Sequence, residues 1–512
     1  MTHHVAAQST QSTASLRTAS VYPHSFRLLH WLLMASLLVL ILTGPSLHTI
    51  ARPDWSLTHG VLPGWFWGGR VLMVHLIAAA VFAPSIVAAA WVYFRRRQRK
   101  RLPYKWNHLL LLGGGLVMLA TGLLLQRLQW QPTLYVAARA VHGLGWLLMT
   151  GSLLWHIVMA LVRWLRLLVP AFHPWADWQW KPVALFAPLA VVTTWLSFSG
   201  NLMPVGRTLL ATRIAPSDNA IEELANLPWQ QAPQLVVYLA NGVGLRGGCT
   251  RASVQALHDG REIYFRLEWD DPQENRQLWP WKKTAEGWES LVTNPRDESV
   301  WYEDKFGLCF PIHRWRQFEL IGCAVVCHAG GGWAYGYKHS PVIIDDWFWK
   351  AVRTDPVGQV DDKYWYRLNR ENKDGGRFAD PKQAGGYDRN ESKDKSHPAF
   401  LPDDVKNIRQ GGLPREHALP YTEELSAKVP PDMLIPGMVI SPFVGDRGDI
   451  RCQSRWKNGK WVVYMRRSLD TGSQYDVQFQ PGGSYPFGVA AFDHTSKRHA
   501  YNFNVYWLVL ER

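Results

Sequence analysis

Residues 135–169, YVAARAVHGLGWLLMTGSLLWHIVMALVRWLRLLV, decide the fold of this chain. The stretch is longer than the roughly 20 apolar residues with which a helix crosses a bilayer. Its two histidines, His142 and His156, lie fourteen positions apart. At about 100° and about 1.5 Å per residue, they return to nearly the same helix face about 21 Å along the axis. Because titratable side chains inside a membrane usually face other helices, the stretch is predicted to belong to a helical bundle.

Four more stretches have the length and apolarity of spans, at about residues 26–48, 70–94, 106–126 and 182–200, which makes five spans in all. After about residue 205 the 512-residue chain changes to short strand-like runs separated by Gly, Pro, Asn and Asp. We therefore predict a membrane all-α helical bundle fused to a mainly β soluble domain. The predicted parts are a disordered tail (1–22), a four-helix domain (23–181), a fifth transmembrane helix (182–204) and the soluble domain (205–512).

The loop between the second and third spans fixes the predicted orientation. It is RRRQRKRLPYK, residues 95–105, and short, strongly basic loops stay on the cytoplasmic side. The N-terminus is then cytoplasmic, and the five spans are predicted to lie in a bacterial inner membrane. An odd number of spans places the C-terminal domain in the periplasm. The formal net charge of +14 comes in part from this loop. Because no recognition motif accompanies the charge, we expect no nucleic-acid partner.

Four histidines sit in the predicted spans at depths that form two pairs. His30 lies near the inner end of the first span, and His156 lies toward the inner side of the fourth. His75 and His142 lie near the outer ends of the second and fourth spans. Two stacked haems b, each bound by one imidazole from the fourth span and one from a neighbour, would use all four. The predicted pairs are His30 with His156 and His75 with His142.

Two alternatives stay open for these histidines. Each ring could be an interfacial side chain that reaches the lipid headgroups. In addition, His48 at the outer end of the first span and His108 at the inner end of the third could replace a chosen ligand.

The apolar half also contains a set of short motifs. They are R-x-x-H-W at residues 27–31, Thr43-Gly44, His75, the K-x-N start of the third span (Lys105, Asn107) and H-x13-H on the fourth. Together they resemble the diheme b-type cytochromes that are the membrane subunits of formate dehydrogenases and nickel-iron hydrogenases. The resemblance covers about residues 22–175 and implies two bis-histidine haems b. It also implies a quinone site near the inner haem, with Asn107 as the position carried over. The fifth span departs from the four-span family core.

The soluble half is predicted to be an antiparallel β-sandwich. Runs such as QLVVYLANG, EIYFRLEWDD and KWVVYMRRSL have strand character and are joined by Gly- and Asp-containing turns. Between the strand groups, about residues 367–430 are rich in Gly, Pro, Asp, Asn and Lys, which predicts a long, partly ordered loop.

A cysteine motif marks the chemistry of the soluble half. Residues 322–328 are GCAVVCH, so Cys323, Cys327 and His328 form C-x-x-x-C-H. Covalent c-type haem usually uses C-x-x-C-H, with the adjacent histidine on the iron. In the haem interpretation Cys323 and Cys327 anchor a further haem, which is then c-type, and His328 binds its iron. If the cysteines do not anchor this haem, it is b-type. In the alternative the two cysteines form a disulfide; zinc would need a fourth donor that the sequence does not locate.

The runs VQALHDGREIYFRLEWDD, DDWFWKAVRTDPVGQVDD and WKNGKWVVYMRRSL resemble the haem-binding γ subunit family of ethylbenzene dehydrogenase and related molybdenum enzymes. The resemblance covers roughly residues 230–510. It implies a β-sandwich that grips one haem b through a methionine and a lysine, and Lys350 is the candidate lysine. Beside His328, the second ligand could be Lys350, His313, His339 or a methionine such as Met465. Cations that could pair with the propionates are Arg314, Arg316, Arg353 and Lys338.

These features predict a membrane-bound multihaem cytochrome that transfers electrons between membrane quinone and a periplasmic redox partner. The partner would be a redox protein, or a molybdenum-enzyme or cytochrome subunit of a larger complex. No catalytic residues are predicted. Two alternatives stay open. One is a haem enzyme that acts on a small periplasmic substrate such as superoxide or an organic compound, and the other is a non-haem binding module on a cytochrome b anchor.

Overall fold

The structure is a computed structural model of the chain. It describes residues 24–51, 68–97, 105–127, 131–164, 188, 191–192, 207–216, 221–292, 300–326, 338–367, 376–404, 411–502 and 504–512. The chain divides into two compact units, one helical and one formed mainly by residues 200–512. The predicted tail and nearly all of the predicted fifth span lie outside the described residues.

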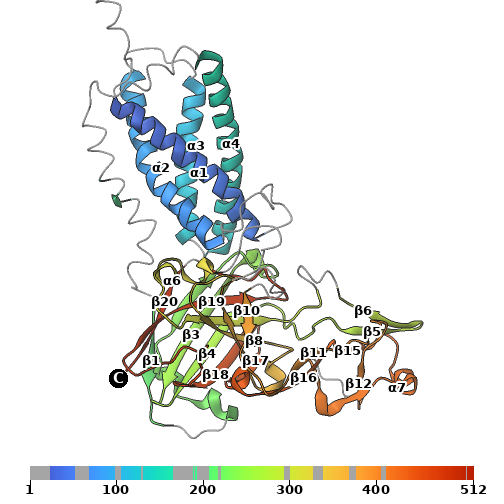
Figure 1. Ribbon diagram of the computed structural model, residues 1–512. Coiled ribbons are helices and arrows are strands. Elements are labelled where there is room, and N and C mark those ends of the chain that lie inside the picture. Colours follow the sequence, from blue (N-terminus) through green and yellow to red (C-terminus); the bar gives the residue numbers. More distant parts are fainter. Residues whose placement is uncertain are drawn as a thin grey trace, which may run out of the picture. The chain divides into compact units, whose positions relative to one another are not determined.

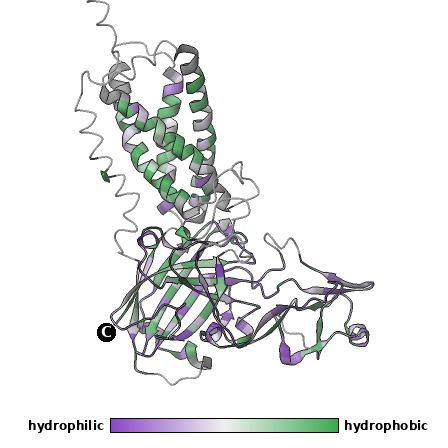
Figure 2. Ribbon diagram, viewed as in Figure 1, coloured by the Kyte–Doolittle hydropathy of each residue, from purple (hydrophilic) through white to green (hydrophobic). Residues whose placement is uncertain are grey.

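The helical unit contains the four predicted long helices (Figure 1). They are α1 (His24–Ala51), α2 (Gly68–Arg97), α3 (Lys105–Arg127) and α4 (Pro132–Trp164). Among the described residues, three stretches are long and apolar enough to cross a membrane: Val71–Trp91, Trp106–Gln126 and Thr133–Val158. A shorter apolar stretch, Leu28–Gly44, lies in α1. Figure 2 shows the predominance of hydrophobic residues along these helices, which gives the unit the character of a membrane anchor.

Small residues let the helices of this unit approach closely. The apolar cluster between them is built on Leu37, Phe82, Ile86, Met149 and Leu153. A side chain at Gly115 of α3 would collide with Ile86, and a Cβ at Gly114 would lie 2.8 Å from the sulfur of Met149. Close approach at small residues is the usual way in which membrane helices gain packing energy.

The second unit is mainly β structure. Its strands are β1 (Thr208–Arg213), β2 (Leu235–Leu239), β3 (Thr250–His258), β4 (Glu262–Asp270), β5 (Trp281–Thr284), β6 (Gly287–Ser290), β7 (Lys305–Pro311), β8 (Ile344–Lys350), β9 (Asp361–Trp365), β10 (Arg377–Ala379), β11 (Ala384–Arg389), β12 (Phe400–Pro402), β13 (Leu413–Pro414), β14 (Ala418–Pro420), β15 (Leu434–Ile435), β16 (Met438–Val444), β17 (Arg451–Trp456), β18 (Lys460–Ser468), β19 (Ser484–Phe492) and β20 (Tyr506–Leu510). Short helices α6 (Arg316–Ile321) and α7 (Glu423–Lys428) and 3-10 turns complete the unit.

Twelve strands form one sheet in the order β10-β9-β8-β7-β19-β20-β1-β3-β4-β18-β17, with β2 paired to β3. Neighbours are antiparallel, except that β1 runs parallel to both β20 and β3. The two halves of the sheet pack face to face. Trp349 of β8 contacts Trp269 of β4 and Trp461 of β18, with ring centroids 5.5 and 4.8 Å apart. This aromatic core confirms the predicted mainly antiparallel sandwich.

The segment predicted as a long loop is more ordered than expected. It contributes β10–β14 and α7. Strand β10 joins the large sheet, β11 and β13 pair with β16, and β12 pairs with β14, while β15, β5 and β6 form a further small sheet. A separate core of Trp281, Leu401, Val429 and Ile435 supports them. Strands of two to six residues are too short to show alternation in sequence, and their partners lie far along the chain, so composition alone indicated only turns.

Candidate functional site

Three histidines of the helical unit lie close together. The rings of His30 on α1 and His156 on α4 have centroids 6.3 Å apart. A metal–imidazole nitrogen bond is about 2.0–2.1 Å long, so two rings on opposite sides of one ion have centroids roughly 6 Å apart. The separation therefore fits the pair to one iron. The ring of His108 on α3 lies 5.5 Å from that of His156 and edge-on to it, which keeps His108 as a competing ligand.

Asn107 is buried beside this histidine group. Its Nδ2 lies 3.5 Å from Nδ1 of His156. The amide NH2 is a donor, so this long contact makes Nδ1 of His156 the acceptor; it orients the ring but does not place the lone pair on Nε2 as the threonines do at the outer pair. The position that the resemblance assigns to the quinone site thus contacts a predicted haem ligand.

The two outer histidines share a hydrogen-bonding arrangement. Thr43 Oγ1 on α1 lies 2.7 Å from Nδ1 of His75 on α2, and Thr121 Oγ1 on α3 lies 2.8 Å from Nδ1 of His142 on α4. Each hydroxyl also donates its one proton to a carbonyl of its own helix, at 2.7 and 2.8 Å respectively. The threonine oxygen must then accept from the imidazole, which places the ring proton on Nδ1 and the lone pair on Nε2. That tautomer is the one a metal-bound histidine needs.

The structure therefore brings the members of both predicted pairs together. His75 and His142 are close enough for their imidazoles to interact electrostatically. The sequence did not assign a role to the hydroxyls of Thr43 and Thr121, because a threonine inside an apolar helix more often bonds only to its own backbone. Assignment of each histidine to a haem stays a prediction.

Replacement Thr121→Val keeps the shape of the side chain and removes the hydrogen bond to His142. We expect about a 10–100-fold weaker haem affinity at the outer site, the usual cost of losing such a partner of a ligand. Haem retention during dilution and the midpoint potentials of the two b haems measure the effect. Thr150→Val is the matched control, because Thr150 Oγ1 bonds the carbonyl of Trp146 in its own helix. Equal haem loss in both variants would contradict a role for Thr121 beyond packing.

A cavity lies over the outer face of β7, β8 and β19. The space between its walls is about 780 Å³, a figure that includes open solvent at its mouth. Gly307 on β7 and Ala490 on β19 leave the space, and Phe348 and Phe492 supply apolar walls.

Positive charge predominates in this cavity. Lys338, Lys363, Arg377 and Lys497 line it, with Asp346 as the acidic side chain among the described lining residues. Burial lowers the pKa of Lys363, and burial raises the pKa of Asp346 to about 6. A haem bound here would have its macrocycle against the apolar walls and its two propionates beside the cations.

Cys323 also lines the cavity, from the short 3-10 helix η6 (Gly322–Val325) that follows α6. It lies beside Cys309 of β7, since a Cβ built on Gly488 would be 2.9 Å from the sulfur of each. Only a glycine at position 488 leaves room for both. Cys327 and His328 lie outside the described residues. The structure therefore places the first residue of the predicted attachment motif at the cavity.

His499 is a cavity residue that the sequence did not single out. It is 6% exposed, and its Nδ1 lies 3.0 Å from the carbonyl oxygen of Lys497. Because a carbonyl only accepts, the ring proton is on Nδ1 and the lone pair on Nε2. Burial lowers the pKa of His499 to about 3, so the ring is neutral. No spacing marks this histidine in the chain, because it reaches the cavity only through the turn that follows β19.

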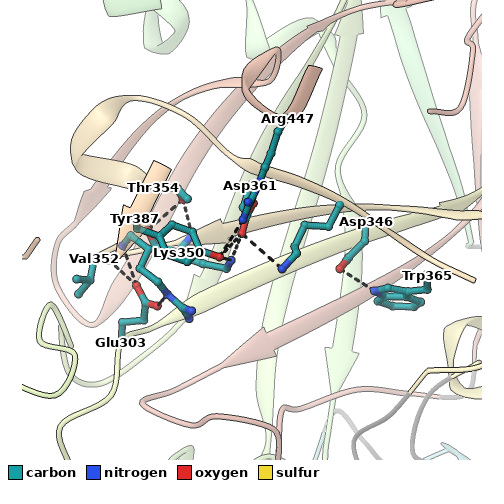
Figure 3. Close-up of polar contacts among 11 residues, drawn as sticks. Glu303, Asp346, Lys350, Val352, Thr354, Asp361, Trp365, Tyr387 and Arg447 are labelled. Carbon is teal, nitrogen blue, oxygen red and sulfur yellow. Dashed lines mark hydrogen bonds and ion pairs between the residues drawn. The ribbon is translucent and has the colours of Figure 1, made fainter. Parts of the chain in front are cut away.

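Lys350 belongs to a neighbouring ion-pair network on the same face of the sheet (Figure 3). Its Nζ pairs with Asp361 of β9 and donates to Tyr387 Oη at 3.0 Å. Asp361 also accepts from Arg447 Nε at 2.6 Å. Burial lowers the pKa of Lys350 to about 8. A lysine ligand must offer the lone pair of a neutral amine to iron, whereas this Nζ is bound in the network, and Lys350 does not line the cavity.

The other residues considered for the external haem also lie away from the cavity lining. His313 is exposed. Met465 is fully buried in the core of the sandwich. His339 is half-buried, and its backbone N–H donates to the carbonyl of Val326. Of the four proposed propionate partners, Lys338 is the one that reaches the cavity.

Comparison with solved structures finds only distant similarity. A proposed carbohydrate-binding protein from Bacteroides uniformis is 8% identical with a TM-score of 0.27, covering 60% of this chain and 99% of that one. A family 9 carbohydrate-binding module from Caldicellulosiruptor kristjanssonii, in complex with cellotriose, is 11% identical with a TM-score of 0.22, covering 59% and 93%. The glucose complex of such a module is 10% identical with the same score, covering 60% and 96%. At these scores the similarity says nothing about what this chain binds.

No curated protein matches the chain significantly. The sequence profile described as ethylbenzene dehydrogenase matches residues 226–503, which is more than half of the 512 residues. The match spans the β unit that contains the cavity, and it confirms the resemblance of the C-terminal half. Because that family binds haem, the match supports a haem cofactor in a redox protein. The chain belongs to the ethylbenzene dehydrogenase family.

Proposed function

We propose that this protein is a membrane-bound multihaem cytochrome that passes electrons between membrane quinone and a redox partner outside the membrane. One b haem would lie between α1 and α4, bound by His30 and His156, and the other between α2 and α4, bound by His75 and His142. The observation that carries the proposal is the pair of outer histidines whose Nδ1 atoms are held by Thr43 and Thr121. A hydrogen bond in each case leaves Nε2 with the lone pair that iron requires.

A third haem would occupy the cavity of the β unit. When bound, haem supplies one-electron redox chemistry that no side chain of this chain provides. Phe348 and Phe492 would exclude water from its faces, and the cavity lysines and Arg377 would bind its carboxylates. Cys323 and Cys327 would anchor it, and His328 would be one iron ligand. We assign the second ligand to one of two cavity side chains, Lys497, which fits the lysine implied by the family resemblance, or His499.

The quinone would bind at the inner histidine group, beside Asn107. The basic loop at residues 95–105 supports a cytoplasmic position for that end of the bundle and a periplasmic C-terminal domain. The surface of the β unit would then meet a periplasmic redox protein, or a molybdenum-enzyme or cytochrome subunit of a larger complex.

Haem quantitation on the purified protein tests this proposal. Pyridine haemochrome spectra before and after acid–acetone extraction separate b haems, which are extracted, from a covalently held c haem. We expect two extractable haems and one retained haem. Three extractable haems would keep the electron path but show that Cys323 and Cys327 do not anchor. If the protein contains only two haems, and variants of the membrane histidines lose both, then the β unit binds no haem and has no redox role.

A further inference from the structure

Five aspartates meet on the interior side of β8 and β9, opposite the cavity. This acidic cluster consists of Asp345, Asp362, Asp380, Asp449 and Asp476. Asp345 and Asp362 are fully buried, and Asp380 and Asp476 are each 3% exposed. Carboxylate oxygens of Asp345, Asp362 and Asp476 lie within 4.8 Å of one another. Asp449 lies equally close to Asp476, and the carboxyl of Asp380 adjoins that of Asp476.

The cluster arises from two Asp–Asp dipeptides in paired strands. Asp345-Asp346 lies in β8 and Asp361-Asp362 in β9, and successive strand residues point to opposite faces of a sheet. Each dipeptide therefore sends one carboxylate outward and one inward. Outward, lysines and an arginine flank Asp346 and Asp361. Inward, the one cation in ion-pair contact with the cluster among the described residues is Arg467, whose Nη1 lies 2.9 Å from Asp345.

Hydrogen bonds do not make up for this deficit of positive charge. Within the part of the chain that the structure describes, seven oxygens of the cluster have no donor: one each from Asp345, Asp449 and Asp476, and both from Asp362 and Asp380. Asp362 is the extreme case, since it is 0% exposed and neither of its oxygens has a partner. Burying an ionised carboxylate without a partner is strongly unfavourable.

A second buried acidic group in the same unit shows what a satisfied arrangement looks like. In the group of Asp271, Asp304 and Asp493, the backbone N–H groups of Asn275 and His494 and the indole of Trp461 donate to Asp304. The imidazole of His494 lies 2.5 Å from Asp493, and its pKa is raised mainly by that hydrogen bond. One oxygen there, on Asp271, lacks a donor. Among the described residues, one cationic side chain serves three carboxyls in this group, whereas Arg467 alone serves five in the acidic cluster, and the cluster leaves seven oxygens without a donor instead of one.

We propose that the acidic cluster is a Ca²⁺ site, with Asp345, Asp362 and Asp476 as its central ligands. Calcium binds about six to eight oxygens, largely from carboxylates, in flexible geometry. The cluster contains seven oxygens without donors, and its three central carboxylates each bring an oxygen within 4.8 Å of the others. Magnesium needs near-octahedral geometry and usually keeps several waters, which suits a buried carboxylate cage less well. Softer metals prefer nitrogen or sulfur ligands, which this set of side chains does not offer.

The ion would join segments that are distant in the sequence. Its ligands come from β8, from β9, from the residue after β10 and from the segments around residues 449 and 476. Calcium would therefore stabilise the edge of the sandwich at which β9 and β10 lie. This role is independent of how many haems the protein binds.

The intact, detergent-solubilised protein tests the site. Protein treated with EGTA and desalted is supplied with Ca²⁺ or Mg²⁺, its bound metal is measured by atomic emission, and its melting is followed by tryptophan fluorescence. We expect about one firmly bound calcium per chain and a melting temperature raised by about 5–10 °C when calcium is in roughly 100-fold excess over its dissociation constant. Unchanged melting together with no bound calcium would overturn the proposal.

Asp362→Asn preserves the shape of the central ligand and removes its charge. The variant is expected to lose the bound calcium and the rise in melting temperature, while its calcium-free form melts no lower than the wild type because like charges no longer meet. Asp388→Asn, at an exposed position of β11, is the matched control and should behave as the wild type. Calcium retained by Asp362→Asn, or lost instead from Asp271→Asn, would place the ion elsewhere and overturn the assignment. If Asp362→Asn does not fold, Asp380→Asn provides the same comparison.

Discussion

His142→Ala is expected to remove one of the two b haems and to leave the other bound. The ring of His142 would be the ligand that α4 contributes to the outer pair, and its Nδ1 is held by Thr121 at 2.8 Å. Alanine leaves the iron with one imidazole, and haem b has no covalent tether to compensate. Haem content measured against protein should fall by one haem per chain, and the low-spin signal of the inner haem should persist.

His75→Ala should give the same loss as His142→Ala, because both histidines are assigned to one iron. His30→Ala and His156→Ala should remove the other b haem. His108→Ala is the control at the inner group, where its ring lies 5.5 Å from that of His156 without being assigned to iron. Loss of haem from His108→Ala but not from His30→Ala would show that His108, and not His30, is the partner of His156 at the inner haem. Loss of both b haems from each single variant that still folds would contradict the assignment of the four histidines to two separate haems.

Asp361→Asn is expected to lower the free energy of unfolding of the β unit by about 3–5 kcal/mol. Asp361 is fully buried and serves three cations: Lys350, Arg447 at 2.6 Å and Lys363 at 3.9 Å. Removing its charge leaves those cations buried without their counter-ion, which is the costly way to break a buried ion pair. At about 2–4 °C per kcal/mol, the melting temperature should fall by roughly 6–20 °C.

Lys350→Met tests whether the loss of stability in Asp361→Asn comes from leaving buried cations without a counter-ion or only from losing the contact between Lys350 and Asp361. Methionine fills a similar volume, and Asp361 keeps Arg447 as a partner, so the loss of stability should be smaller than for Asp361→Asn. Asp388→Asn removes a surface carboxylate paired with Arg415 at 3.1 Å, and such exposed pairs contribute about 0–1 kcal/mol. Equal melting temperatures for Asp361→Asn and Asp388→Asn would show that the network of Figure 3 does not stabilise the fold. Normal haem content in Lys350→Met would separately support placing the external haem in the cavity.

Much of the fold follows from local patterns. Helices α1 to α4 were predictable because apolar length is read directly from the chain, and the sandwich was predictable because its longer strands alternate. The segment at about residues 367–430 was not, since β13 has only two residues and pairs with β16. Its stability comes from a small shared core that is invisible until the strands are placed together.

The candidate site divides in the same way. The spacing of His142 and His156 and the motif that begins at Cys323 are linear features, so they could be found in the sequence. His499 and the lysines of the cavity converge from strands and turns whose positions depend on register. Lys350 was proposed as a haem ligand from the family resemblance, and only the tertiary structure shows that its neighbours in space are Asp361 and Tyr387.

The sequence alone determined that this protein is a helical membrane anchor joined to a β-sandwich of a haem-binding family, because hydrophobic length, alternation and short motifs are properties of neighbouring residues. Only the tertiary structure decided which histidines meet, which ring nitrogen is held by a threonine, and where the cavity lies. It also decided that each Asp–Asp dipeptide of β8 and β9 divides its charge between a face rich in lysine and arginine and a face with Arg467 alone in ion-pair contact, among the residues described. The physical reason is that burial, hydrogen bonding and charge compensation depend on strand register and helix packing, which bring together residues far apart in the chain.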